Sequence, residues 1–175
     1  MQVWDRPVRL LHWALVVAVA TAGLTIWWWA GLHQAAGYGA LTAVVLRILW
    51  GVVGSRYARF AQFVRSPRAT SDYLRLLLQR GEPRYIGHNP LGGWMVLVLL
   101  GCVTGLGLTG WLYTSDRFWG DETIERFHVA LAWALLGLVA LHLAGVAYTS
   151  LRHRENLLRA MFGGSKREPA PGDIS

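Results

Sequence analysis

"HVALAWALLGLVALH", residues 128–142, places a histidine at each end of an apolar stretch that contains no charged residue. On an α-helix, which rises about 1.5 Å per residue, the two imidazoles lie about 21 Å apart. Successive residues turn by about 100°, so His128 and His142 return to within about 40° of the same direction. The stretch therefore predicts a membrane-crossing helix that carries two titratable rings on one face, at two depths.

Three other runs along the chain are similarly apolar. The chain has 175 residues, of which 54% are hydrophobic and only 15% are charged, and this is too apolar for an ordinary soluble domain. Each run is long enough to cross about 30 Å of hydrocarbon. The four runs are residues 8–30, 35–54, 91–113 and 123–150. We therefore expect an all-α integral membrane protein, a four-helix up-and-down bundle over residues 1–163. Residues 164–175, rich in Pro, Gly and charge, are expected to be a disordered tail.

Lysine and arginine are distributed unevenly between the two faces of the expected bundle. Fourteen of them lie on the face that holds both termini and the loop between the second and third runs. The opposite face holds Arg117 and Arg126, beside four acidic residues. Because cytoplasmic loops carry an excess of positive charge, both termini are expected to be cytoplasmic. The net charge of +7 then reflects orientation and attraction to anionic lipid, so no nucleic-acid partner is expected.

The basic loop between the second and third runs predicts a short helix within residues 66–81. Ser66 is a suitable N-cap, Pro67 fits the first helical position, and Gly81 can end the helix. The leucines of this segment, interspersed with arginines, favour a helix that lies on the cytoplasmic lipid surface. A basic loop helix without lipid contact is the open alternative.

Four histidines fall at two matched depths of the expected bundle. His33, near the outer end of the first two runs, shares one level with His128, while His12 shares the inner level with His142. Each pair draws its members from different helices. Haem iron takes two axial imidazoles on opposite faces of the ring, so its ligands come in pairs at equal height. The spacing therefore predicts two stacked haems, an outer one and an inner one.

Histidines in a membrane segment also serve functions other than haem binding. Zinc or copper sites need three or four converging ligands, and no such cluster occurs in the sequence. A proton relay stays open, although relays normally recruit Asp or Glu deep within the spans, and no run carries one away from its ends. The lone Cys102 can form no internal disulfide, and no C-x-x-C-H motif is present, which excludes covalent haem attachment of the c type.

Several further residues are candidates for supporting roles. Arg47 is the only charge away from the ends of a run, and a haem propionate is a suitable anion for it, although snorkelling to the interface is an open alternative. His88 can serve as a loop cap, replace His12 as a ligand, or contact a quinone. Glycines of the third run permit close approach of either a helix or a flat cofactor. These are Gly101, Gly105, Gly107 and Gly110.

Five stretches of the chain resemble the bacterial cytochrome b561 family, which includes the cytochrome b subunits of nickel-iron hydrogenases. They are "VWDRPVRLLHW", "LHQAAGY", "RYARFAQFVRSPRA", "RYIGHNPLGGW" and "FHVALAWALLGLVALH". The likeness covers residues 3 to about 163. It implies a four-helix protein of the bacterial inner membrane that binds two b haems. The ligands carried over are His12, His33, His128 and His142.

Iron with two axial imidazoles has no open coordination position, so such haems transfer electrons and do not activate oxygen. The resemblance implies single-electron transfer across the bilayer, between the quinone pool and a periplasmic partner such as a c-type cytochrome, a hydrogenase or another dehydrogenase. A self-contained superoxide:quinone oxidoreductase is the first alternative, and a haem-free transporter or scaffold is the second. Enzymatic activity and oligomeric state stay open.

Overall fold

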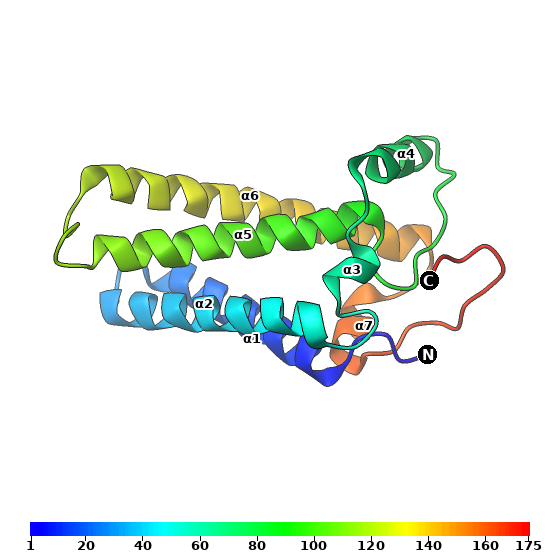
Figure 1. The fold of residues 1–175 in the computed structure, drawn as a ribbon, viewed down its shortest axis with the longest axis horizontal. Coiled ribbons are helices and arrows are strands. Elements are labelled where there is room, and N and C mark those ends of the chain that lie inside the picture. The colour runs from blue at the N-terminus through cyan, green and yellow to red at the C-terminus, as the bar shows by residue number, and fades with distance from the viewer. The chain divides into compact units, whose positions relative to one another are not determined.

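The computed structural model describes residues 1–175, and its regular secondary structure is helical. The helices, shown in Figure 1, are α1 (Arg6–Thr25), α2 (Ala30–Val53), α3 (Phe60–Phe63), α4 (Pro67–Leu78), α5 (Pro90–Tyr113), α6 (Glu122–Arg152) and α7 (Leu157–Gly163). The β contacts are isolated bridges, which pair Gln2 with Ser165 and Tyr85 with Ile174. The expected all-α class is confirmed.

Four of these helices, α1, α2, α5 and α6, are long and apolar enough to cross a membrane. They overlap the four runs expected from the sequence and are consistent with a four-span membrane bundle. The cytoplasmic position of both termini stays a prediction from the distribution of charge.

The connection between α1 and α2 lies earlier along the chain than the sequence predicts. α1 ends at Thr25, whose carbonyl accepts the Trp29 amide at 2.9 Å. α2 begins at Ala30, and the amide of His33 bonds to the Trp29 carbonyl at 2.9 Å. Because the tryptophans of this turn are apolar, hydropathy alone does not reveal where α1 ends and α2 begins. His33 therefore lies inside the first turn of α2.

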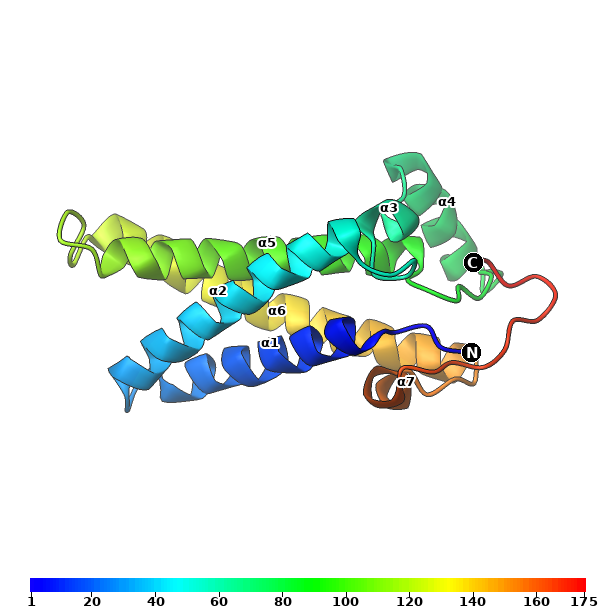
Figure 2. The same ribbon diagram turned by 60° about the horizontal axis from the view of Figure 1, so that its bottom comes forward.

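The chain divides into two compact units, each built from separate segments. Unit 1 consists of Met1–Arg9, Leu49–Leu97 and Leu141–Ser175, and includes both termini and the short helices α3, α4 and α7. Unit 2 consists of Leu10–Ile48 and Val98–Ala140. Within unit 2, the segments of α5 and α6 run side by side, as Figures 1 and 2 show.

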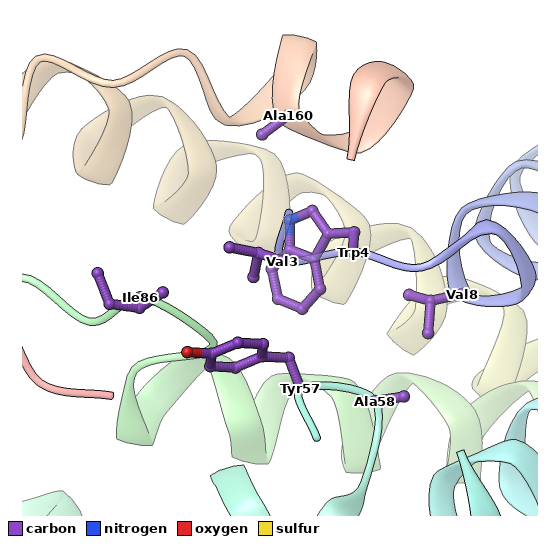
Figure 3. Close-up of a cluster of buried hydrophobic side chains, with 7 residues drawn as sticks. All are labelled: Val3, Trp4, Val8, Tyr57, Ala58, Ile86 and Ala160. Carbon is purple, nitrogen blue, oxygen red and sulfur yellow. The ribbon is translucent and has the colours of Figure 1, made fainter. Parts of the chain in front are cut away.

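A cluster of buried hydrophobic side chains forms the core of unit 1 (Figure 3). The indole of Trp4 lies between Ala160 of α7 and the ring of Tyr57, which follows α2 in sequence. The other members of the cluster are Val3, Val8, Ala58 and Ile86. The cluster therefore joins four parts of the chain: the N-terminal segment, the loop after α2, the segment that precedes α5, and helix α7.

Unit 1 also contains a buried network of charged side chains around Arg84. The Arg84 guanidinium donates to Glu155 and to Asp173, each at 2.5 Å, and its side chain is only 4% exposed. Lys166 lies 3.5 Å from Glu155. Burial alone would raise the pKa of both carboxyls, but the hydrogen bonds that they accept, including those from Arg84, hold each pKa below its usual value.

Residues 164–175, for which composition predicts disorder, take part in this network and in main-chain hydrogen bonds. The Lys166 amide donates to the Met1 carbonyl at 2.9 Å. The Ile174 amide donates to the Arg84 carbonyl, and the Ile86 amide donates to the Ile174 carbonyl, each at 2.9 Å. The partners lie far away in the sequence, so composition gives no sign of these contacts.

The loop helix α4 begins and ends through identifiable caps. Ser66 is the N-cap, as predicted, and its hydroxyl accepts the Ala69 amide at 3.3 Å. At the other end, the Gly81 amide donates to the Leu76 carbonyl at 2.9 Å, as in a Schellman motif. The left-handed residue of this motif is Arg80, with φ of 56°, and not Gly81. The predicted helix is confirmed, although its end uses a different residue.

Candidate functional site

The structure brings His33 and His128 together inside unit 2. His33 lies in the first turn of α2, and His128 lies in the second turn of α6. Their ring centroids are 6.2 Å apart, the ring planes are inclined at 70°, and both residues are partly buried. His33 and His128, which were expected to share one level, are therefore neighbouring imidazoles from different helices, and their binding of a haem stays a prediction.

The tautomer of His33 follows from its hydrogen bond. Its Nδ1 atom lies 2.8 Å from the Ala22 carbonyl oxygen. A carbonyl oxygen can only accept, so Nδ1 carries the proton and donates it. The lone pair of the ring is then on Nε2, which is the atom left to bind a metal ion.

The tautomer of His128 follows by one further step. Its Nδ1 atom lies 2.9 Å from the Thr109 hydroxyl oxygen, and that oxygen lies 2.7 Å from the Gly105 carbonyl oxygen. Two oxygens approach this closely when a proton lies between them, so the Thr109 hydroxyl donates to Gly105. Thr109 must then accept from Nδ1–H, and His128, like His33, has its lone pair on Nε2.

The spacing of the two rings would allow both to hold one metal ion. Metal–nitrogen bonds of about 2 Å, with ring centres about 1 Å beyond each nitrogen, would put the two ring centres about 6 Å apart. The separation between His33 and His128 is 6.2 Å. No group of three or more His, Cys, Asp or Glu side chains gathers as zinc sites require.

The glycines of α5 differ in what lies next to them. A Cβ on Gly110 would lie 3.3 Å from Cε1 of His128. A Cβ on Gly105 would lie 3.0 Å from Cδ1 of Leu131, across the contact between α5 and α6. Nothing lies within 4 Å of a Cβ built on Gly101. Close helix packing and close approach to a candidate ligand are therefore both present along one helix.

The predicted inner residues are distributed over both units. His12 lies in the unit 2 part of α1, with its ring edge-on to Trp13 at 5.1 Å, whereas His142 lies in the unit 1 part of α6. The pairing of His12 with His142 stays a prediction. Arg47, on α2 in unit 2, is 6% exposed. Such burial disfavours snorkelling and fits a guanidinium that faces an anion inside the protein.

His88 lies in unit 1 and packs between two aromatic rings. Its ring centroid is 4.7 Å from Trp4 and 4.4 Å from Phe63. This packing joins the segment before α5 to the N-terminal segment and to α3. A packing role for His88 is thus present in the structure, and contact with a quinone stays a prediction.

The chain belongs to the prokaryotic cytochrome b561 family, whose model matches residues 3–164. It is 24% identical to the probable Ni/Fe-hydrogenase B-type cytochrome subunit of Azotobacter chroococcum mcd 1, over 93% of this chain and 86% of that protein. The corresponding subunit of Rhizobium leguminosarum bv. viciae is 23% identical over 94% and 87% of the two chains. No solved structure matches the chain.

Membership of this family makes the chain a multi-pass membrane cytochrome that transfers electrons, and the b type implies haem b. The resemblance found in the sequence is confirmed. Thr109 and Ala22, which hold the two rings, have no signal in the sequence, because each contact joins residues of different helices.

Proposed function

We propose that this cytochrome binds two b haems at two depths of the membrane. His33 and His128 hold the outer haem, and His12 and His142 hold the inner haem. The observation that carries the proposal is the pair of neighbouring imidazoles, with ring centroids 6.2 Å apart, whose Nδ1 atoms both donate to acceptors on other helices. The family supports the choice of haem b.

The residues of the chain orient and neutralise the cofactors. Hydrogen bonds from Nδ1, to the Ala22 carbonyl for His33 and to the Thr109 hydroxyl for His128, hold each outer ring in one tautomer and leave Nε2 to bind the iron. The buried guanidinium of Arg47 is suited to bind a propionate of the inner haem through charge-assisted hydrogen bonds. The bound haems supply reversible one-electron oxidation and reduction.

We further propose that electrons pass across the bacterial inner membrane, between the quinone pool and a partner at the periplasmic face. The loop before α6 and its first turn carry acidic residues that favour a cationic partner. These are Asp116, Asp121, Glu122 and Glu125. The names of the relatives support a redox partner complex. The alignment with the Azotobacter chroococcum subunit spans 210 positions, more than the 175 residues of this chain, so that subunit carries insertions that this chain lacks.

Transfer across the bilayer can be tested in vesicles that contain the purified protein and trapped ferricyanide. An added membrane quinol is expected to reduce the ferricyanide when wild-type protein is present. The His128→Ala variant is expected to lose this reaction, and His153→Ala, which alters a histidine beyond the last span, is expected to keep it. Wild-type protein that contains two haems but leaves ferricyanide oxidised refutes the transmembrane route.

The self-contained alternative predicts a different result. If the isolated protein reduces quinone with superoxide and needs no partner, the chain is a superoxide:quinone oxidoreductase. A fresh preparation without reduced-haem absorption bands would exclude both functions and leave a haem-free membrane protein.

A further inference from the structure

Thr109 of α5 forms hydrogen bonds both to a candidate haem ligand and to the backbone of its own helix. Its hydroxyl oxygen lies 2.9 Å from Nδ1 of His128 and 2.7 Å from the carbonyl oxygen of Gly105. The hydroxyl has one proton, which it donates to Gly105, so its oxygen accepts the proton of Nδ1. A chain of two hydrogen bonds therefore runs from the His128 ring to the backbone of α5.

We infer that Thr109 is a positioning residue that fixes the tautomer of His128 and sets the reduction potential of the outer haem. This inference rests on the proposed binding of a haem between His33 and His128. A hydrogen bond accepted from Nδ1 makes the imidazole a stronger electron donor, because it gives the ring partial negative character. Stronger donation from an axial ligand stabilises ferric iron and lowers the potential.

The two outer ligands differ in how their hydrogen bonds can be changed. His33 donates to a backbone carbonyl, that of Ala22, which no side-chain substitution removes. His128 donates to a hydroxyl, which itself donates onward and is thereby polarised as an acceptor. The His128 side is consequently the one on which a side-chain substitution, at Thr109, can change donation to the iron.

A threonine that bonds back to the carbonyl four residues earlier is common in helices and by itself indicates no function. Thr104 does this in the same helix, since its hydroxyl donates to the Leu100 carbonyl at 2.8 Å. Thr109 differs from Thr104 because its oxygen also accepts from a histidine of another helix. Thr104 is therefore a matched control for the removal of a back-bonded hydroxyl from α5.

The experiment compares Thr109→Val, Thr109→Ser and Thr104→Val by redox titration of the haem absorption bands. Thr109→Val is expected to raise the midpoint potential of one haem and leave the other unchanged. Thr109→Ser restores the hydroxyl and is expected to return the wild-type value, and Thr104→Val is expected to titrate as wild type. If Thr109→Val contains both haems and titrates as wild type, the inference is wrong.

A second measurement decides the case in which the valine variant loses a haem. Retention of both haems in Thr109→Ser then shows that the hydroxyl is required, whereas loss in both variants shows a packing role and overturns the inference. In haem-free protein, ¹⁵N NMR of the imidazoles is expected to show the Nδ1–H form of His128 in wild type and a mixture in Thr109→Val. An unchanged tautomer in Thr109→Val contradicts the inference. If wild-type protein and His128→Ala contain equal haem, the proposed function fails separately.

Discussion

Gly110→Val is expected to weaken the binding of the outer haem selectively. A Cβ on Gly110 would lie 3.3 Å from Cε1 and 3.7 Å from Nδ1 of His128, so the ring has to give by a few tenths of an ångström even for alanine. Valine adds two methyl groups at this point. Overpacking of a filled site costs about 1–3 kcal/mol. This cost corresponds to roughly 5- to 150-fold weaker haem binding, because about 1.4 kcal/mol is a factor of ten.

Gly101→Val provides the matched control, since nothing lies within 4 Å of a Cβ at Gly101. Both substitutions place the same β-branched residue in α5, so their effects on helix propensity cancel. The assay is the transfer of haem from each variant to excess apomyoglobin. Gly110→Val should release one of two haems faster and the other at the wild-type rate. Equal release from Gly101→Val and Gly110→Val would show that the contact with His128 is irrelevant.

Three further predictions concern unit 1. Arg84→Met leaves two buried carboxylates without their main cation, and such a change typically costs about 3–5 kcal/mol. Amide hydrogen exchange over residues 164–175 should therefore accelerate by about 100-fold or more. In the control, substitution of the exposed Arg68 by Met should leave the exchange rate at the wild-type value. Acid should also release residues 164–175, because folding lowers the pKa of the Glu155 and Asp173 carboxyls. The stabilisation that these carboxylates provide is complete above their unfolded pKa values of about 4. It is lost as the pH falls through their lower, folded pKa values. Proteolysis between pH 7 and 2 measures this release, and an Arg84→Met protein that keeps the same pH profile would contradict it. Arg80→Gly should stabilise the protein by about 1 kcal/mol in thermal unfolding, because glycine adopts the left-handed conformation freely, whereas Arg75→Gly inside α4 should destabilise it by a similar amount.

The spans and the loop helix were predictable because their signals are local. Hydrophobic length alone identifies α5 and α6, whose bounds differ from the expected runs by one or two residues. The N-cap of α4 could be predicted because Ser66, a favoured N-cap residue, is followed directly by Pro67. The start of α2 was misplaced by five residues, because the apolar turn that ends at Trp29 has the same hydropathy as the helices on either side.

The contacts that hold the candidate ligands could not be predicted in the same way. Helical periodicity places His128 and His142 on one face of a helix, but it does not reveal which residue of another helix accepts from the Nδ1 atom of His128. Thr109 performs this role and looks identical in sequence to Thr104, which does not. The contacts of residues 164–175 were missed for a related reason, since ion pairs such as that of Asp173 with Arg84 join residues far apart in the chain.

The arrangement of ligands in two tiers can be tested by counting haems per protein in double histidine variants. His33→Ala combined with His128→Ala removes both ligands of one proposed haem, so one haem per protein should remain. His33→Ala combined with His142→Ala removes one ligand from each proposed haem, so none should remain. If the two double variants retain the same number of haems, the four histidines do not form the proposed outer and inner pairs.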